Sequence, residues 1–117
     1  MAWAKKVSSV APSNSKVIFF STTEELQAKL NSLCELFDLL VVDVDADRIE
    51  YCKIGLKLLN KNGVVIWDDT NGPDWPSIKK ILEGFGFREI SFLGMTPQTI
   101  HVSRTSIFYR EGNCLEI

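Results

Sequence analysis

Two kinds of hydrophobic pattern alternate along the chain, and together they predict an α/β fold. Short continuous apolar runs are typical of strands that are covered on both faces, and three such runs occupy residues 17–20, 39–42 and 64–67. Between and after them, apolar residues recur every three or four positions, as on one face of a helix, over residues 26–37, 49–59 and 78–85. A further short helix is predicted over residues 3–10. Strands that alternate with helices indicate a parallel sheet with right-handed crossovers.

Polar residues before each helical stretch predict where the helices begin. Thr22 with Glu25, and Asp47 with Glu50, have the spacing of a capping box. Asp74 is a candidate N-cap for the last of these helices, because a proline follows in the first turn, where a missing N–H group is tolerated.

The last third of the chain changes character. Residues 87–93 and 105–110 read as strands with no helix between them, so they are expected to pair antiparallel around a turn at residues 94–97. A second turn is predicted at residues 61–63, where Gly63 would end a helix. The predicted order of strands across the sheet is 17–20, 39–42, 64–67, 105–110, 87–93.

These patterns predict a three-layer α/β fold, with a mostly parallel open sheet and a C-terminal antiparallel hairpin, in one domain over residues 1–117. A chain of 117 residues has the size of one small domain, and 45% hydrophobic residues fit a globular protein. The net charge of −2 gives no electrostatic reason to expect binding to nucleic acid or to an anionic membrane. Three cysteines without metal-site spacing favour reduced thiols and a cytoplasmic location.

Carboxylates follow two of the predicted strands directly. Asp43, Asp45 and Asp47 come after residues 39–42, and Asp68 and Asp69 come after residues 64–67. Ligands of open α/β sheets sit beyond the carboxyl ends of the strands, so these acids are candidates for binding a divalent cation or for acting as a general base. The alternative is that they are ordinary turn residues, and Asp47 is already explained as a helix cap.

The order and spacing of two segments carry a resemblance to a known family. Residues 37–43, FDLLVVD, are followed by a helix and then by residues 58–69, LLNKNGVVIWDD. This arrangement resembles the second half of a class I S-adenosylmethionine-dependent methyltransferase of Rossmann-like fold. The final hairpin is similar to the one that closes some small-molecule methyltransferases.

The resemblance implies roles for particular residues. Asp43 would lie beside the site of the methyl donor and the small-molecule acceptor, with Asp43 and Asp68 as the catalytic pair. Ser21 and Thr22 would approach the adenine of S-adenosylmethionine. In the metal-dependent branch of the family, the positions of Asp43, Asp68 and Asp69 bind a divalent cation, although that branch usually has asparagine at the last of these positions.

The chain also departs from the family. The glycine-rich turn that cradles the cofactor and the acid that holds its ribose have no counterpart in the sequence. We therefore expect a C-terminal portion of a methyltransferase that binds S-adenosylmethionine weakly or not at all. Such a portion is expected to form a homodimer or to associate with a complementary chain. Two alternatives are a non-catalytic, self-associating remnant and a receiver-like signalling domain. In the latter the acidic pair would come earlier in the chain.

Overall fold

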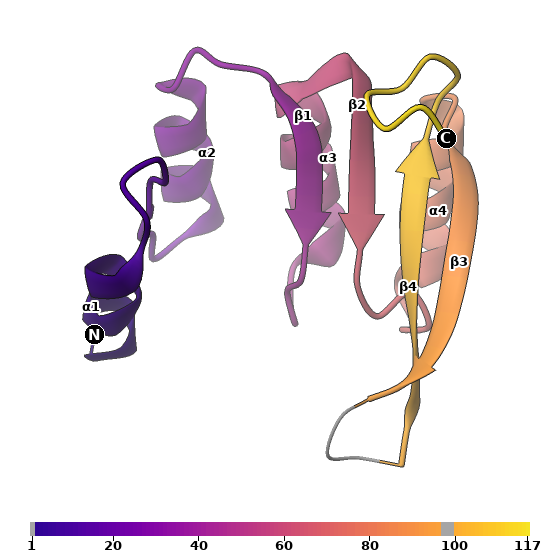
Figure 1. Cartoon of the computed structure of the whole chain (residues 1–117), viewed down its shortest axis with the longest axis horizontal. Coiled ribbons are helices and arrows are strands. Elements are labelled where there is room, and N and C mark those ends of the chain that lie inside the picture. The colour runs from indigo at the N-terminus through magenta and orange to yellow at the C-terminus, as the bar shows by residue number, and fades with distance from the viewer. Residues whose placement is uncertain (1, 97–99) are drawn as a thin grey trace. The chain divides into compact units, whose positions relative to one another are not determined.

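The computed structural model describes residues 2–96 and 100–117. Its elements, labelled in Figure 1, are the helices α1 (Ala2–Val10), α2 (Thr23–Asn31), α3 (Arg48–Leu58) and α4 (Trp75–Gly84), and the strands β1 (Phe37–Val42), β2 (Leu59–Trp67), β3 (Arg88–Met95) and β4 (Val102–Tyr109). The chain divides into two compact units, and the boundary along the sequence lies between Cys34 and Glu35. Each unit is described by itself below, and the organisation into one domain stays a prediction. Among the described residues, no helix has the length and apolar character needed to cross a membrane.

The first unit contains α1 and α2, and the capping box predicted for α2 is confirmed. The Thr22 hydroxyl oxygen accepts a hydrogen bond from the backbone N–H of Glu25 at 3.2 Å. In return, the Glu25 carboxylate accepts one from the backbone N–H of Ser21 at 2.8 Å. These two bonds satisfy N–H groups that a helix start otherwise leaves without partners. The helix ends at Asn31, so the predicted extension of its apolar face to Leu33 and Phe37 is wrong.

The predicted strand at residues 17–20 is also wrong, because these residues belong to no strand. The predicted pairing of this segment with residues 39–42 therefore does not occur either. A run of four apolar residues is stable as a strand only where a neighbour takes up its backbone hydrogen bonds. Here the Phe19 carbonyl instead accepts a hydrogen bond from the Lys29 ammonium group, which belongs to α2.

The second unit is built on a four-stranded open sheet, which confirms the predicted α/β class. The strand order is β1-β2-β4-β3, as predicted for these four strands. β1 and β2 are parallel, with Val42 opposite Trp67, whereas β4 is antiparallel to both β2 and β3. The terminal hairpin is thereby confirmed.

Two predicted turns and two predicted caps differ from the expectation. Residues 61–63 lie inside β2, which begins at Leu59 directly after α3, so the predicted turn is absent. Residues 94–95 lie in β3 rather than in a turn, and Pro97 is outside the described residues. Asp47 and Asp74 do precede helices, but neither side chain makes a capping hydrogen bond.

The core lies between the sheet and the helices α3 and α4, which cover the same face of the sheet (Figure 1). Its centre consists of aromatic and aliphatic side chains that are fully or almost fully buried: Val65, Trp67, Trp75, Ile78, Leu82 and Phe108. The Trp75 ring lies 6.1 Å from that of Trp67 and 5.4 Å from that of Phe108, centroid to centroid. Large buried aromatic groups contribute most of the hydrophobic stabilisation in a core of this size.

Strand alternation places other side chains on the opposite face of the sheet, where the second unit has no helix. Leu39 and Val41 of β1 and Phe92 of β3 lie there, and they are 44%, 62% and 54% exposed. At both edge strands of the sheet, β1 and β3, this helix-free face therefore exposes apolar side chains to solvent.

Candidate functional site

The strand register brings the two predicted acidic turns to the same edge of the sheet. Val42 and Trp67 are paired at the ends of β1 and β2, and the next backbone N–H, that of Asp68, donates to the Val42 carbonyl at 3.0 Å. Asp43 and Asp68 thus follow neighbouring strands at one position, as the sequence predicted. The Asp43 side chain is exposed and has none of the hydrogen bonds that hold Asp68 and Asp69.

Hydroxyl groups of β4 hold the carboxylates of the second turn. The Thr105 hydroxyl donates to Asp68 Oδ1, and the Ser103 hydroxyl donates to Asp69 Oδ1, both at 2.5 Å. Asp69 has a φ angle of 50°, in the left-handed region that only a few residue types tolerate. The turn after β2 is therefore fixed by side chains of a strand more than thirty positions further along the chain.

Arg48, in the first turn of α3, ties the ends of β1 and β2 together. Its guanidinium donates to the carbonyls of Asp68 at 2.6 Å, Asp69 at 3.0 Å and Val44 at 3.3 Å. Its Nε atom lies 3.4 Å from the Asp74 carboxylate. Only 11% of the Arg48 side chain is exposed. A planar group with five N–H donors suits this role, because it can reach several oxygens at once.

Arg48 is not among the site residues predicted from the sequence, although one signal for it exists. A positive charge in the first turn of a helix faces the positive end of the helix dipole and is unfavourable there unless other groups hold it. Arg48 directly follows an aspartate turn and begins α3. An arginine at such a position is therefore a candidate for contacts outside its own helix.

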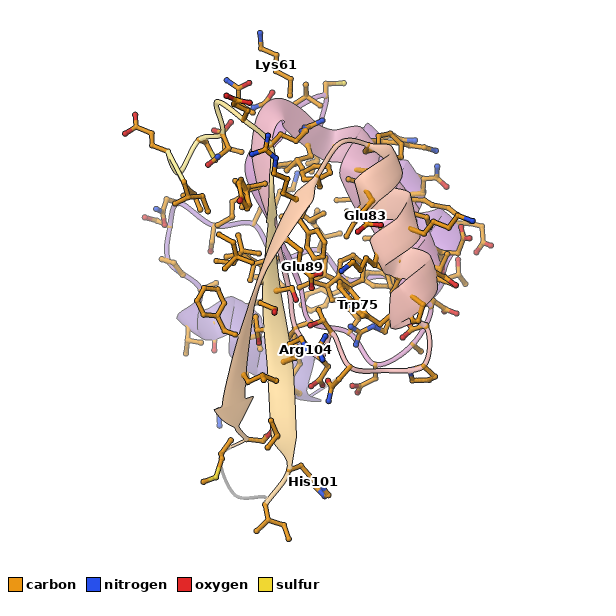
Figure 2. The ribbon with its side chains drawn as sticks, turned by 90° about the vertical axis from the view of Figure 1, so that its right-hand side faces the viewer. Lys61, Trp75, Glu83, Glu89, His101 and Arg104 are labelled. Atoms are coloured by element: carbon orange, nitrogen blue, oxygen red, sulfur yellow. The ribbon has the colours of Figure 1, made fainter. Side chains whose placement is uncertain are left out.

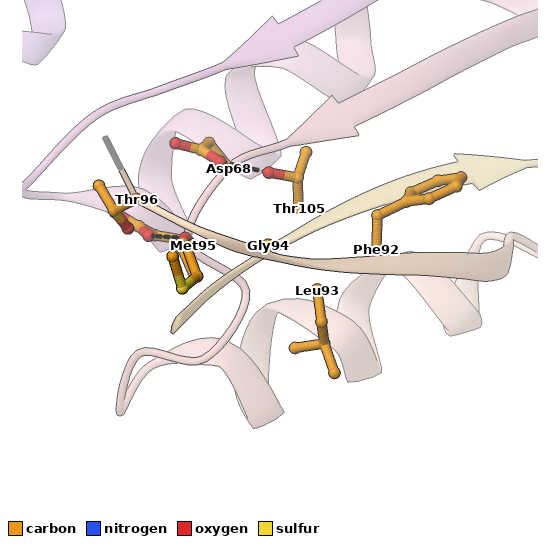
Figure 3. A pocket seen from close by; sticks show the side chains of 9 residues that line it. Asp68, Phe92, Leu93, Gly94, Met95, Thr96 and Thr105 are labelled. Carbon is orange, nitrogen blue, oxygen red and sulfur yellow. Dashed lines mark hydrogen bonds between the residues drawn. The ribbon is translucent and has the colours of Figure 1, made fainter. Parts of the chain in front are cut away.

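A cavity of about 340 Å³ opens between the turn after β2, which carries Asp68 and Asp69, and the two strands of the hairpin (Figure 3). Asp68 and Asp69 line one side of it, and residues 92–95 of β3 together with Thr96 line another. Gly94 belongs to the β3 side of the cavity, and an added Cβ atom there would meet no atom within 4 Å. Figure 3 shows Phe92 and Leu93 directed to opposite sides of β3, so Phe92 is the side chain that shares the Thr105 face.

A second, more polar cavity of about 550 Å³ lies on the other side of the same turn. Asp45, Arg48 and Asp69 line it together with the loop of residues 71–74 that leads into α4. The two cavities share Asp69, so the turn after β2 separates them.

A series of hydrogen-bonded polar side chains lies next to the turn after β2 and connects it to the hairpin and to α4. Thr70 is fully buried, and its hydroxyl contacts the Ser106 hydroxyl at 2.8 Å. Ser106 in turn donates to the Glu89 carboxylate at 2.7 Å, whose other oxygen lies 2.7 Å from the Lys79 ammonium. Figure 2 shows Glu89 between the hairpin and α4. Burial alone raises the pKa of Glu89, but the hydrogen bonds from Lys79 and Ser106 outweigh it, so the net pKa is lowered.

The remaining predicted roles are not supported by a complete site. Within the part of the chain that the structure describes, no three potential metal ligands form a group that could hold an ion. Ser21 and Thr22 lie in the first unit, where the capping box of α2 uses the Ser21 N–H group and the Thr22 hydroxyl. Their contact with a cofactor stays a prediction.

Comparison with known proteins identifies the fold. No protein-family model and no curated protein sequence matches the chain. Among solved structures, a precorrin-6y C5,15-methyltransferase from Geobacter metallireducens matches 91% of this chain with a TM-score of 0.62 and 10% identity. A Klebsiella pneumoniae protein described as an O-methyltransferase matches 73% with a TM-score of 0.52 and 16% identity. The M1.HpyAVI–SAM complex matches 81% with a TM-score of 0.54 and 16% identity.

These similarities show that the chain has the open-sheet α/β fold of Rossmann-like methyltransferases. The matched regions span 59%, 46% and 54% of those three structures, so the chain covers about half of the length of each of them.

Proposed function

We propose that this chain is the C-terminal portion of an S-adenosylmethionine-dependent methyltransferase and supplies the side of the site that receives a small-molecule acceptor. The observation that carries the proposal is the position of Asp43 and Asp68 at adjoining strand ends in a methyltransferase-like fold. Ligands of such sheets bind at this edge. Asp43 is exposed and available to a ligand, whereas Asp68 and Asp69 are already oriented by hydroxyl groups of β4.

The residues present fit only part of a site for S-adenosylmethionine. A cofactor that lies against the backbone needs a strand-to-helix turn whose glycines permit close approach. The loops after β1 and β2 have no glycine at positive φ among the described residues; Gly86 and Gly112 have that conformation elsewhere. An added Cβ atom at Gly72, in the loop before α4, would already lie 3.1 Å from the Asp74 carboxylate. We therefore propose that another segment, from the same polypeptide or from a complementary chain, provides the cradle for the cofactor.

A nuclear magnetic resonance titration with S-adenosylhomocysteine tests the proposal. The chain alone should bind with a dissociation constant of about 1 mM or weaker, because its described loops after β1 and β2 lack the glycine cradle for the cofactor. Amide shifts should concentrate at residues 43–45 and 68–69. Asp43→Asn should reduce them, since it removes the charge of an exposed strand-end carboxylate that the hydroxyls of β4 do not hold.

Asp38→Asn is the matched control, because Asp38 lies near the opposite end of the same strand and its role as an acceptor from Asn60 survives in the amide. This variant should leave the titration unchanged. Shifts scattered over the surface, or equal effects of the two substitutions, would refute the placement of the site. Binding in the micromolar range would instead show that the chain carries a complete cofactor site.

A further inference from the structure

We infer that the cavity beside the hairpin binds a small organic cation with an aromatic or apolar body, such as a primary amine. This inference concerns the acceptor side of the site and rests on the proposed function only in identifying that ligand as the methyl acceptor. The binding itself requires no cofactor. Three features of the cavity support it: its charge, its aromatic wall and its glycine floor.

The charge of the cavity is negative. Asp68 and Asp69 contribute two carboxylates, and the described lining residues include no lysine, arginine or histidine. The nearby guanidinium of Arg48 is directed to the carbonyl oxygens of these residues and to Asp74. Each carboxylate accepts one hydroxyl hydrogen bond at a single oxygen, so further acceptor sites remain for a cationic group. A cation that enters the cavity is attracted by both acids, and an anion is repelled by both.

The wall and the floor of the cavity fit a flat apolar body. Phe92 is 54% exposed, and its pairing with Thr105 places both residues on the helix-free face of the sheet. An aromatic face attracts both apolar groups and cations. Gly94 pairs with Ser103 on the same face, and the space above it is open. The missing side chain at this position leaves room between Phe92 and the carboxylates.

The test compares three ligands with the same ring and different tail charge: tyramine, 4-ethylphenol and 3-(4-hydroxyphenyl)propionate. Binding is measured by nuclear magnetic resonance at low salt without any cofactor. Tyramine should bind at least about tenfold more tightly than the propionate, because its ammonium group lies near two carboxylates. Added salt should reduce the difference in affinity between tyramine and the propionate, because it screens the charges. Equal affinity for tyramine and the propionate would overturn the inference, as would the absence of shifts at residues 68–69 and 92–96.

Gly94→Leu places a side chain in the cavity, since a Cβ atom at this position has no atom within 4 Å, and should weaken tyramine binding at least about tenfold. The matched control is Gly84→Leu, since Gly84 also has open space around it but lies at the end of α4. Unchanged tyramine binding in Gly94→Leu would overturn the inference. The double variant Asp68→Asn/Asp69→Asn gives an independent test: it should abolish the preference for tyramine over 4-ethylphenol and leave 4-ethylphenol binding unchanged. A preference that survives this substitution would refute the role of the acids.

The outcomes separate the two proposals. If tyramine binds as described and the shifts caused by S-adenosylhomocysteine are scattered away from the strand ends, the cation site stands and the proposed placement of the cofactor site fails. If S-adenosylhomocysteine shifts residues 43–45 and 68–69 but tyramine shows no preference over the propionate, the cofactor site stands and an organic cation is excluded as the methyl acceptor.

Discussion

Replacing Arg48 with methionine should destabilise the second unit strongly, because this mostly buried charged side chain holds two loops together, the one after β1 and the one after β2. The substitution keeps an unbranched apolar stem but removes hydrogen bonds to the carbonyls of Asp68, Asp69 and Val44, together with the ion pair to Asp74. A hydrogen bond that involves a charged group contributes about 1.5–3 kcal/mol, and a buried partner left unsatisfied costs about 1–3 kcal/mol.

The net loss is smaller than the sum of these contributions. Asp69 is exposed and Asp68 is only partly buried, so water can replace part of what their carbonyls lose. The Arg48 guanidinium also lies 5.7 Å from the centre of the Trp67 ring, and the methionine stem keeps part of that contact. We expect a decrease in the free energy of unfolding of about 2–4 kcal/mol, and about half as much for Arg48→Lys, whose ammonium cannot reach all three carbonyls.

Urea denaturation followed by tryptophan fluorescence measures this loss, since Trp67 and Trp75 are buried in the core of the same unit. The control is Lys53→Met on the same helix. Lys53 is 52% exposed and forms a surface ion pair with Glu50, so its removal should cost less than about 0.5 kcal/mol. If Arg48→Met and Lys53→Met had the same effect, Arg48 would not hold the strand ends together, and our explanation of this turn would be wrong.

Three further predictions concern titration, thiol reactivity and association. The pKa of Glu89 is lowered from 4.5 and that of Lys79 is raised from 10.5. Their ion pair therefore stabilises the fold at pH values between 4.5 and 10.5, where both groups are charged. In urea denaturation, the stability advantage of wild type over Glu89→Gln should therefore disappear as the pH falls below about 4. Burial raises the pKa of Cys52 to about 11. An aromatic disulfide reagent at pH 8 should modify Cys34 and Cys114 rapidly and Cys52 only in denaturant; three equally fast thiols would contradict the buried position. Because Val41 is 62% exposed on the end strand β1, we expect concentrated protein to sediment as a dimer and Val41→Lys to sediment as a monomer.

The sequence predicted those parts of the fold that depend on local hydrophobic pattern. Residues 39–42 and 64–67 are continuous apolar runs, and each forms the last part of a strand that is followed directly by an aspartate. The hairpin followed from two strand patterns with no helix between them. The failure at residues 17–20 has a physical cause, because an apolar run becomes a strand only when a partner takes up its backbone hydrogen bonds, and a pattern along the chain does not contain that information.

The contacts that shape the candidate site were beyond prediction for a related reason. The bond from Thr105 to Asp68 joins residues 37 positions apart, and that from Arg48 to Asp68 joins residues 20 apart. Such pairs depend on the strand order and on side-chain reach, both of which appear only after the chain has folded. The capping box at Thr22 joins residues three positions apart, and the spacing alone predicted it correctly.

The turn that carries Asp68 and Asp69 is rigid because two different elements, α3 and β4, bind different atoms of it. Arg48 of α3 binds its carbonyl oxygens, whereas hydroxyls of β4 bind its carboxylates. Below it, Thr70 donates its backbone N–H and its hydroxyl to the Arg104 carbonyl, at 2.7 and 3.1 Å. The carboxylates of Asp68 and Asp69 therefore keep their orientation before any ligand arrives, and a ligand need not supply the free energy to order them. Asp43 has no such support, so ligand binding must fix its side chain. The hairpin side of the site should therefore determine ligand selectivity, while Asp43 should adjust to whatever is bound.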